Sequence, residues 1–449
     1  MVYNIKRFEK EKGDGTLMKI LLVAPGPNEH KKVKLVPFPQ ASLPLLAALT
    51  PPQHEVVIVD ERAEYVPFEE QFDLVGITAM TATSQRAYQI ADRFREKGTK
   101  VVLGGMHPSA CPEEALQHAD AVVIGEAEGL WEQLLEDLEK GELKKTYTRE
   151  DFPAIYRLPP SRLDLLKCRY LLKYVFQTTR GCPHGCSFCS VSRFMGRKYR
   201  HRDIDNVIEE VSLYQDKTRI IGFLDDNIVS NPRYSKELFR ALIPLKKKWV
   251  SQETLNIADD DELISLAQKS GCIALFVGIE SVNEETLKNA HKSFNKVKNY
   301  KRLIEKFHQH GIMIIGSFVF GFDEDDTSVF QKTLEFIEDA KIDFAQFSIL
   351  TPLPGTEIFY QLKNENRIFT YDWSKYDFAH VVYQPARMTA EELQKGYNEV
   401  FRKFYSWPLA WKRVLRNWKY LHYFIPATLY YNWVSRHPKE LPNSIPEAT

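Results

Sequence analysis

Residues 174–189 read YVFQTTRGCPHGCSFC and carry the most informative motif of the chain. A short apolar segment leads directly into a loop in which Cys182, Cys186 and Cys189 have the spacing C-x3-C-x2-C. Three thiolates can bind three irons of a [4Fe–4S] cluster, whose complete ligation by protein takes four cysteines. The spacing therefore indicates a cluster with one iron left open to another ligand.

A zinc site is the alternative for the same cysteines. Structural zinc sites usually have four ligands, typically arranged as two pairs. His184 offers a fourth donor, but the order C-x-H-x-C is unusual for zinc. Gly181 and Gly185 suit a loop that wraps closely around an inorganic core, because glycine tolerates positive φ. The spacing favours iron–sulfur over zinc and leaves both interpretations open.

The sequence after this motif alternates apolar and amphipathic segments. Strands are predicted over 174–177, 220–224, 249–250, 273–279, 313–320 and 344–350. Helices are predicted over 203–214, 232–248, 259–269, 296–310 and 326–340. Strands that are apolar throughout are buried on both faces, as in parallel sheets. Residues 174–355 are therefore expected to form a (β/α)6 barrel or partial barrel, with its chemistry at the carboxyl ends of the strands.

A second α/β pattern precedes the motif, in residues 18–142. Its strands are predicted over 20–23, 56–59, 74–77, 101–103 and 121–124. Two of its helices, 84–97 and 126–140, are followed by Gly98 and Gly141, which are typical C-terminal stops. This order predicts a small doubly wound domain, and such domains bind ligands beyond the carboxyl ends of their strands.

The remaining segments lack this alternation. Residues 143–173 are charged, contain three prolines and no clear period, and are interpreted as a linker. Residues 356–449 are predicted to form a mainly helical, aromatic-rich C-terminal region. The predicted fold class is therefore α/β, with a doubly wound domain, a barrel and a helical region. A length of 449 residues suits two or three domains.

Composition excludes several classes of protein. The chain has 60 Lys and Arg against 60 Asp and Glu, and 44% of its residues are hydrophobic. It is therefore neither a disordered protein nor a globally basic one, and no nucleic-acid partner is expected. Residues 1–17 lack the apolar core of a secretory signal, and no run reaches the roughly 18 apolar residues that span a bilayer. Six cysteines without an export signal favour metal or redox chemistry and a cytoplasmic location.

The cysteine motif resembles that of a known family. Cys182, Cys186 and Cys189, with Phe188 before the last cysteine, match the CxxxCxxC signature of radical S-adenosylmethionine (SAM) enzymes, and the strand order resembles their partial (β/α)6 TIM barrel. The resemblance implies that the three cysteines are catalytic ligands of a [4Fe–4S] cluster, whose unique iron binds SAM. An electron from a flavodoxin- or ferredoxin-type donor would cleave SAM to methionine and a 5′-deoxyadenosyl radical.

The resemblance also implies SAM contacts at successive strand ends of the barrel. The matching positions are Phe188, Asp225, Asp226, Gln252, Glu280, Ser281, Gly316 and Gly321. Asp225-Asp226-Asn227 departs from the Gly-Gly-Glu that many members have at the second strand. The alternative for each position is a polar strand end that is hydrogen-bonded within the barrel rim. Together the positions favour a ligand site.

Residues 18–142 resemble the cobalamin-binding domain of the cobalamin-dependent, class B radical SAM enzymes. The cobalamin contacts implied are Thr78, Met80, Thr81, Gly104, Gly105, Met106, His107, Gly125 and Glu126. The chain lacks the Asp-x-His-x-x-Gly loop of cobalamin mutases, so Met80 and Thr81 are expected to face the cobalt from below and His30 to lie at the surface. Cys111 lies near these loops in the sequence. The alternative is a domain that keeps this fold without binding cobalamin.

With cobalamin bound, the resemblance implies a methyltransferase that methylates an unactivated carbon and uses SAM both as radical source and as methyl donor. One alternative keeps the radical without methyl transfer, in a ring rearrangement, a cyclisation or a carbon–carbon coupling. A non-catalytic Fe–S sensor belongs to a different class. It explains the cysteines but not the polar strand ends.

The C-terminal region carries a further signal. Apolar residues recur at helical spacing at Trp411, Val414, Leu415, Trp418, Leu421 and Ile425, with Lys412, Arg413, Arg416 and Lys419 largely off that stripe. Such a helix usually packs on its own protein, and the alternative is a peripheral helix on an anionic membrane. Residues 351–356 and 385–389 resemble the hopanoid-methylase-like subset, which implies a lipid or isoprenoid substrate. Residues 401–449 have eight basic and two acidic residues, so a tail of +6 balances a body of −6.

Overall fold

The computed structural model describes residues 17–27, 35–416, 425 and 429. Several residues named above lie outside this part: residues 1–16, His30, Trp418, Lys419, Leu421 and the side chains of Val414 and Arg416. The chain divides into two compact units. The first comprises residues up to 175 and residues 200–210, and the second comprises residues 176–199 and those from 211 onward.

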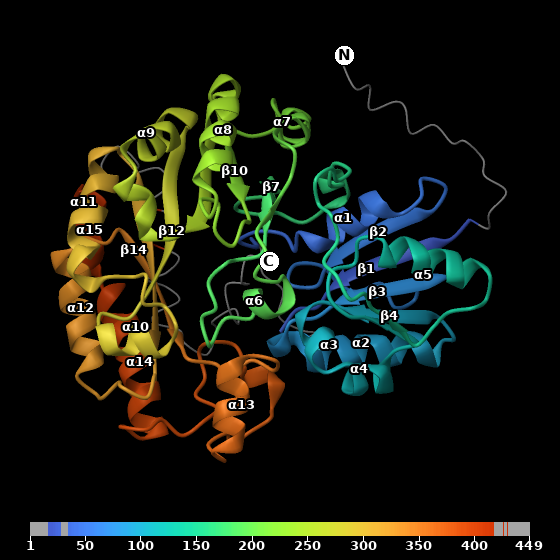
Figure 1. Ribbon diagram of the computed structural model, residues 1–449. Coiled ribbons are helices and arrows are strands. Elements are labelled where there is room, and N and C mark those ends of the chain that lie inside the picture. The colour runs from blue at the N-terminus through green and yellow to red at the C-terminus, as the bar shows by residue number, and fades with distance from the viewer. Residues whose placement is uncertain (1–16, 28–34, 417–424, 426–428, 430–449) are drawn as a thin grey trace. The chain divides into compact units, whose positions relative to one another are not determined.

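The first unit is built on a parallel sheet of six strands (Figure 1). The strands are β1 (Lys19–Ala24), β2 (Glu55–Asp60), β3 (Leu74–Thr78), β4 (Lys100–Gly104), β5 (Ala121–Val123) and β6 (Thr146–Tyr147), in the order β2-β1-β3-β4-β5-β6. The chain order reverses between β1 and β3, which confirms the doubly wound fold and places a ligand-binding crevice beyond the carboxyl ends of these strands. Strand β6 lies in the segment interpreted as a linker, where two residues are too few to show a period.

Helices cover both faces of this sheet (Figure 1). They are α1 (Ser42–Leu49), α2 (Ser84–Glu96), α3 (Met106–Ala110), α4 (Pro112–His118) and α5 (Leu130–Glu139). Helix α5 begins later than predicted because Gly129, with φ of 79°, precedes it in a left-handed conformation. Gly98 and Gly141 follow α2 and α5 with φ of 82° and 73°, which confirms both as stops.

The second unit contains another six-stranded sheet, with its strands in simple chain order. They are β7 (Val175–Phe176), β10 (Ile220–Phe223), β11 (Lys248–Glu253), β12 (Cys272–Glu280), β13 (Met313–Phe320) and β14 (Phe344–Ile349). The pairs from β10 to β14 are parallel. Parallel neighbours in chain order form the predicted partial barrel, with β7 and β14 at its two edges.

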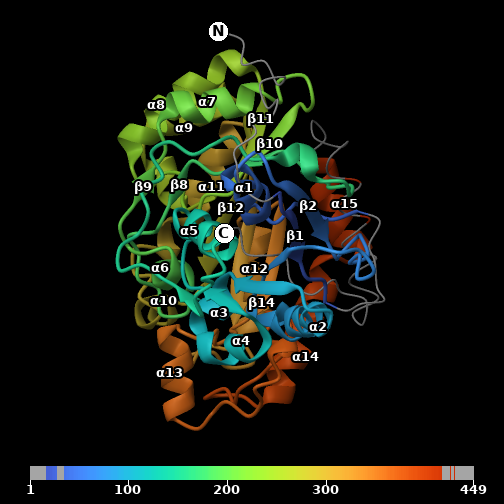
Figure 2. The ribbon, with the colours of Figure 1, turned by 90° about the vertical axis from the view of Figure 1, so that its right-hand side faces the viewer.

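Helices connect the barrel strands (Figure 2). They are α6 (Val191–Phe194), α8 (Pro232–Leu242), α9 (Asp261–Ser270), α10 (Glu284–Asn289), α11 (Tyr300–Gln309) and α12 (Val329–Asp339). Three short elements, β8 (Thr179–Arg180), β9 (Arg200–His201) and α7 (Ile204–Ser212), lie between β7 and β10 in the sequence.

The prediction for β11 covered only two residues. It was too short because polar side chains occupy the second half of the strand. Helix α8 correspondingly ends at Leu242, well before the predicted 248. Between them Lys246 has φ of 53°, which ends the helical path. Trp249 of β11 is fully buried and packs against Phe223 and Phe239, with ring centroids 5.8 and 5.1 Å away.

The C-terminal region is helical, as predicted. It contains α13 (Glu357–Asn364), α14 (Ala390–Phe404) and α15 (Trp407–Arg416). The expectation for Arg413 was wrong: its side chain is buried and lies 3.8 Å from the Phe404 ring centroid. Trp411 and Leu415 are instead 53% and 72% exposed. Within the described residues, no helix is long and apolar enough to cross a membrane.

Candidate functional site at the cysteine loop and the strand ends

The three cysteines lie in the loop between β8 and α6, and each is partly buried. Gly181 starts the loop with φ of 83°, and a Cβ there would lie 2.5 Å from the Lys198 carbonyl oxygen. Only glycine fits this position. Gly185 does not have the positive φ expected of it. Its Cβ position lies 3.2 Å from the Arg197 guanidinium carbon, a contact that the exposed Arg197 side chain can relieve by a small movement.

Burial is the main influence on the acidity of the thiols. Burial raises the pKa of Cys182 to about 11, and burial also raises the pKa of Cys186. Cluster binding must therefore displace protons from these thiols. Among the described residues, the group of three metal-binding side chains whose donor atoms lie within 4.8 Å of one another does not include these cysteines.

His184, the fourth donor in the zinc alternative, stacks on Phe294 with ring centroids 3.8 Å apart. Burial lowers the pKa of His184, with a smaller contribution from the positive charge of Lys292. The ring is therefore held by an aromatic contact, and this supports the cluster interpretation over a zinc site.

Asp225 follows β10 and was predicted to contact SAM. Its side chain is fully buried, and Oδ1 accepts hydrogen bonds from the backbone nitrogen and the hydroxyl of Thr178, at 3.0 and 2.9 Å, and from the same two groups of Thr179. Burial raises the pKa of Asp225 to about 6. These bonds hold the two residues that lead into the cysteine loop, so Asp225 positions that loop through Oδ1.

Glu280 ends β12 and forms a buried ion pair with Lys292, at 2.6 Å between Oε1 and Nζ. Glu280 has φ of 62°, a left-handed conformation that is uncommon for a residue other than glycine. Although burial opposes its charge, the carboxylate of Glu280 and the thiolates of Cys186 and Cys189 raise the pKa of Lys292. The sequence reasoning missed Lys292 because it lies in a loop after α10, away from any strand end.

Of the other predicted SAM residues, Asp226, Gln252, Ser281 and Gly321 lie at or near the carboxyl ends of β10 to β13, and Phe188 lies in the cysteine loop. Gln252 donates from Nε2 to the Asp226 carbonyl oxygen at 3.4 Å, which brings two of them together. Phe188 packs edge-on against Phe322, with centroids 5.7 Å apart. Gly316 is the exception, because it lies within β13 rather than at its end.

Two more of these residues are held by local contacts. The Ser281 hydroxyl accepts a hydrogen bond from the Asn283 backbone nitrogen at 3.1 Å. Gly321 has φ of 103°, and its carbonyl oxygen accepts a hydrogen bond from the Tyr383 hydroxyl at 2.5 Å.

A buried acid, Asp325, holds the turn after β13. Its Oδ2 accepts hydrogen bonds from the backbone nitrogens of Gly321 and Phe322 at 3.0 and 3.2 Å, and burial raises its pKa from 3.8 to about 7. The proton is thus bound more tightly in the folded state. The free energy of unfolding should fall as pH rises from about 4 to 7, by at most about 4 kcal/mol.

We expect Asp325→Asn to remove this pH dependence, because asparagine keeps an acceptor and does not titrate. Urea unfolding of both proteins should give similar stabilities near pH 4 and a variant that is increasingly more stable than the wild type up to pH 8. Asp326→Asn is the matched control, since hydrogen bonds from Ser328 lower the pKa of Asp326 below this window. Equal slopes for the wild type and Asp325→Asn between pH 5 and 8 would contradict the assignment.

In the first unit, the residues predicted to contact cobalamin cluster at the carboxyl ends of β3, β4 and β5. Gly105 has φ of 97°, and a Cβ there would lie 2.8 Å from Thr78 Oγ1 and 2.9 Å from the Ala79 carbonyl oxygen. Gly125 has φ of 86° and nothing within 4 Å of its Cβ position. Gly105 is therefore required by its own turn, whereas Gly125 leaves backbone at the end of β5 open to close approach by a ligand.

Several of the residues predicted to contact cobalamin take part in local turns, helix starts or ion pairs of the first unit. Met80 and Thr81 begin the turn before α2, and the Met80 backbone nitrogen donates to Thr83 Oγ1 at 3.2 Å. Met106 and His107 form the first turn of α3, and the His107 side chain is fully buried. Glu126 is buried and forms an ion pair with Arg200, with 2.9 Å between Oε2 and Nη1.

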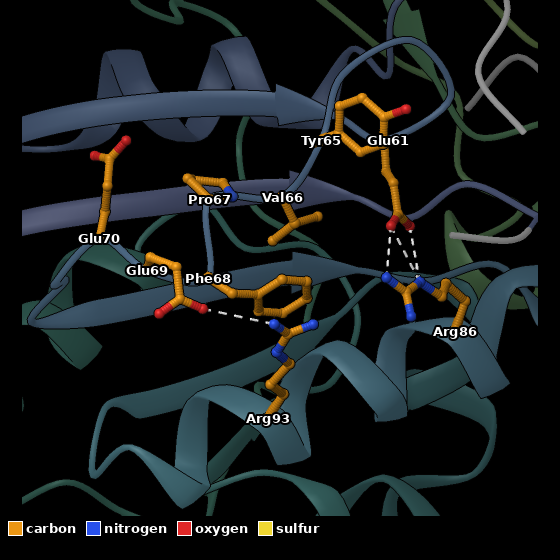
Figure 3. A pocket seen from close by; sticks show the side chains of 9 residues that line it. All are labelled: Glu61, Tyr65, Val66, Pro67, Phe68, Glu69, Glu70, Arg86 and Arg93. Carbon is orange, nitrogen blue, oxygen red and sulfur yellow. Dashed lines mark hydrogen bonds and ion pairs between the residues drawn. The ribbon is translucent and has the colours of Figure 1, made fainter. Parts of the chain in front are cut away.

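A pocket of about 330 Å³ lies elsewhere in the first unit (Figure 3). Its wall includes Arg86, which is paired with Glu61 at 2.7 Å, and Arg93, whose guanidinium carbon lies 3.8 Å from the Phe68 ring centroid. None of the predicted site residues lines it. Both arginines are engaged in internal contacts, so the pocket does not mark the site.

Comparison with known proteins finds a matching family model in each half of the chain. Residues 176–337 match the family model of the radical SAM superfamily, and residues 43–135 match that of the B12 binding domain. The chain is 35% identical over 384 residues to bacteriochlorophyllide d C-12(1)-methyltransferase of Chlorobaculum tepidum, covering 83% of this chain and 84% of that protein. It is 32% identical to the C-8(2)-methyltransferase of the same organism, covering 85% and 88% of the two chains.

More distant matches extend the comparison. The hopanoid C-2 methylase of Rhodopseudomonas palustris is 26% identical, with 83% of this chain and 74% of that protein covered. The structure of the radical SAM methyltransferase TsrM from Kitasatospora setae superposes with a TM-score of 0.63 at 17% identity, covering 78% of this chain and 75% of that one. This last likeness shows a shared fold.

The cofactors follow from these matches and from the sites described. They are a [4Fe–4S] cluster, SAM and cobalamin. The cysteine loop and the glycine-lined strand ends fit the cluster and cobalamin, respectively. The chain therefore belongs to the cobalamin-dependent radical SAM enzymes, and its relatives include methyltransferases and an anaerobic magnesium-protoporphyrin IX monomethyl ester cyclase.

Proposed function

We propose that this enzyme is a C-methyltransferase that acts on an unactivated carbon of a polycyclic, largely apolar molecule. The observation that carries the proposal is the three-cysteine loop beside the first barrel strand, in a chain whose preceding domain matches the B12 binding domain. When bound, the cluster supplies the electron that cleaves SAM, and cobalamin supplies the methyl group. A non-catalytic Fe–S sensor would need neither the second cofactor domain nor the polar strand ends.

The chain's own residues hold and orient these groups. Cys182, Cys186 and Cys189 are proposed to bind the cluster, and Asp225 holds the segment that leads into their loop. Lys292 supplies a buried positive charge near the thiolates. The residues proposed to contact SAM remain those expected from the sequence, namely Phe188, Asp225 through Oδ2, Asp226, Gln252, Glu280, Ser281, Gly316 and Gly321.

The substrate class is inferred from the relatives. The two bacteriochlorophyllide methyltransferases are 35% and 32% identical to this chain, and the hopanoid methylase is 26% identical. We therefore place a cyclic tetrapyrrole before the lipid or isoprenoid that residues 351–356 and 385–389 suggested. Both are extended ring systems with unactivated carbons, and they are distinguished by the test below.

The test is product analysis with the reconstituted enzyme and SAM that carries a deuterated methyl group. Bacteriochlorophyllide d and a hopanoid would be offered separately under reducing, anaerobic conditions. Formation of 5′-deoxyadenosine and transfer of the labelled methyl to one of them is the expected result, and the acceptor identifies the substrate class. 5′-Deoxyadenosine with an altered but unlabelled product would indicate a rearrangement or cyclisation. If no 5′-deoxyadenosine formed with any substrate or reductant, the enzyme proposal would be refuted.

We expect Gly105→Ala to weaken cobalamin binding about tenfold or more, because the added Cβ meets Thr78 Oγ1 and the Ala79 backbone at under 3 Å and the turn must shift. Gly98→Ala is the matched control. Gly98 also has positive φ, at 82°, but nothing lies within 4 Å of its Cβ position, so only the backbone strain is shared. Titration with hydroxocobalamin measures both affinities. Equal affinities for the two variants would argue against cobalamin at this turn.

A peripheral membrane contact is proposed for α15, which exposes Trp411 and Leu415 beside Lys412. Exposed aromatic and aliphatic side chains next to a basic one suit the interface of an anionic bilayer. Co-sedimentation with phosphatidylglycerol vesicles should fall in Trp411→Ala/Leu415→Ala. It should be unchanged in Tyr360→Ala, a control on α13 that is 51% exposed. An equal loss of vesicle binding in Trp411→Ala/Leu415→Ala and Tyr360→Ala, or no loss in either, would count against the membrane contact. Arg413 is unsuited to this test because it is buried.

A further inference from the structure

A short segment after the Gly104-Gly105 turn brings three different metal-binding side chains together. His107 belongs to α3, Glu114 belongs to α4, and Cys111 stands at the junction between the two helices. The donor atoms of these three side chains all lie within 4.8 Å of one another. The Nε2 of His107 is 3.3 Å from Oε1 of Glu114. His107 is among the residues expected to contact cobalamin, whereas Cys111 and Glu114 have no role in the radical SAM chemistry described above.

The backbone explains why the three side chains meet. Helix α3 ends at Cys111, whose φ of −130° and ψ of 59° break the helical path, and α4 begins at the next residue, Pro112. Hydrogen bonds from the Cys111 nitrogen to the His107 oxygen, at 2.9 Å, and from the Ala115 nitrogen to the Cys111 oxygen, at 3.1 Å, continue across the break. The two helices thus present positions 107, 111 and 114 on one side.

We infer that His107, Cys111 and Glu114 bind a zinc ion. An imidazole nitrogen, a thiolate and a carboxylate are all zinc ligands, and three protein ligands plus water complete a tetrahedron. Zinc bond lengths of about 2.0–2.3 Å place neighbouring ligands about 3.4–3.6 Å apart. The 3.3 Å separation of His107 and Glu114 is close to this spacing. Cys111 and Glu114 are only partly buried, so rotations of their side chains can close the remaining distances.

The surroundings fix the position of His107. His107 is fully buried, and its backbone nitrogen donates to the Ala79 oxygen at 3.1 Å, which fixes the start of α3. Tyr88 of α2 lies beside the group, with its ring centroid 6.2 Å from that of His107. The ion would tie α3 to α4 directly after the Gly104-Gly105 turn. It would therefore hold in place the strand end that is proposed to meet cobalamin.

The experiment measures zinc in the full-length enzyme with its iron–sulfur cluster reconstituted, so that Cys182, Cys186 and Cys189 are occupied by iron. After incubation with Zn²⁺ and dialysis against a mild chelator, elemental analysis should find about one zinc per chain. X-ray absorption at the zinc edge should show one sulfur ligand together with nitrogen and oxygen ligands. Cys111→Ala should lose the sulfur ligand, and the amount of zinc that it retains should fall by at least about tenfold.

Cys168→Ala is the matched control, because Cys168 is another partly buried thiol of the first unit and should not affect zinc. Glu114→Gln is a second variant that keeps the side-chain shape, and it should also reduce zinc retention. Zinc below about 0.1 per chain in the wild type, a zinc shell without sulfur, or retention unchanged in both Cys111→Ala and Glu114→Gln would overturn the site. If Cys111→Ala fails to fold, the wild-type absorption spectrum and Glu114→Gln still decide the question.

Discussion

Replacing Cys186 by alanine is expected to abolish cluster-dependent cleavage of SAM, with 5′-deoxyadenosine formation reduced more than about 10³-fold. The loop supplies three thiolates, and a cluster already short of one protein ligand does not survive loss of another. Iron content and the visible absorption of the cluster should fall together with activity. The same outcome is expected for Cys182→Ala and Cys189→Ala.

The chain offers two matched controls for this experiment. Cys168 and Cys272 are free cysteines outside the loop, the first partly buried and the second fully buried at the start of β12. Cys168→Ala and Cys272→Ala should keep the cluster and the rate of SAM cleavage, although Cys272→Ala leaves a small cavity. A cluster that persists in Cys186→Ala, or one that disappears equally in Cys168→Ala, would refute the assignment of ligands.

Most of the fold could be predicted from the sequence, because buried parallel strands appear in it as continuous apolar runs. Strand β13 was predicted at its exact bounds, Met313–Phe320. Strand β11 was underestimated because Ser251 and Glu253 are polar yet buried at its end. Strand β6, of two residues, had no pattern to detect. Local periodicity therefore identifies long apolar strands and misses those whose burial is decided by tertiary packing.

Residue types at the strand ends were predicted better than their contacts. The pattern placed Asp225 and Glu280 beside a ligand, but the structure engages Asp225 with Thr178 and Thr179, and Glu280 with Lys292. These partners lie in other segments and share no periodic signal with them. Arg413 shows the same limit, since helical spacing predicted a surface position and the chain instead stacks it over Phe404.

The second prediction with a large expected effect concerns the buried ion pair of Glu280 and Lys292. Both side chains are at least 90% buried and lie 2.6 Å apart. Removing one partner of such a pair leaves an uncompensated charge and typically costs about 3–5 kcal/mol, whereas neutralising both costs far less. Lys292→Met is therefore expected to lower the free energy of unfolding by about that amount, and Lys292→Met/Glu280→Gln by much less. Urea unfolding of the wild type, the single variants Lys292→Met and Glu280→Gln, and the double variant completes the double-mutant cycle.

The same substitution has a second consequence that a purely structural role would not produce. Lys292 raises the local potential near Cys186 and Cys189, and a nearby positive charge stabilises the more negative, reduced form of a cluster. Lys292→Met should therefore shift the cluster to a lower reduction potential, measured by redox titration with electron paramagnetic resonance. Lys288→Met is the control, because Lys288 is a lysine of the same segment that lies in the last turn of α10. An unchanged potential in Lys292→Met would show that the pair supports the fold without tuning the cluster.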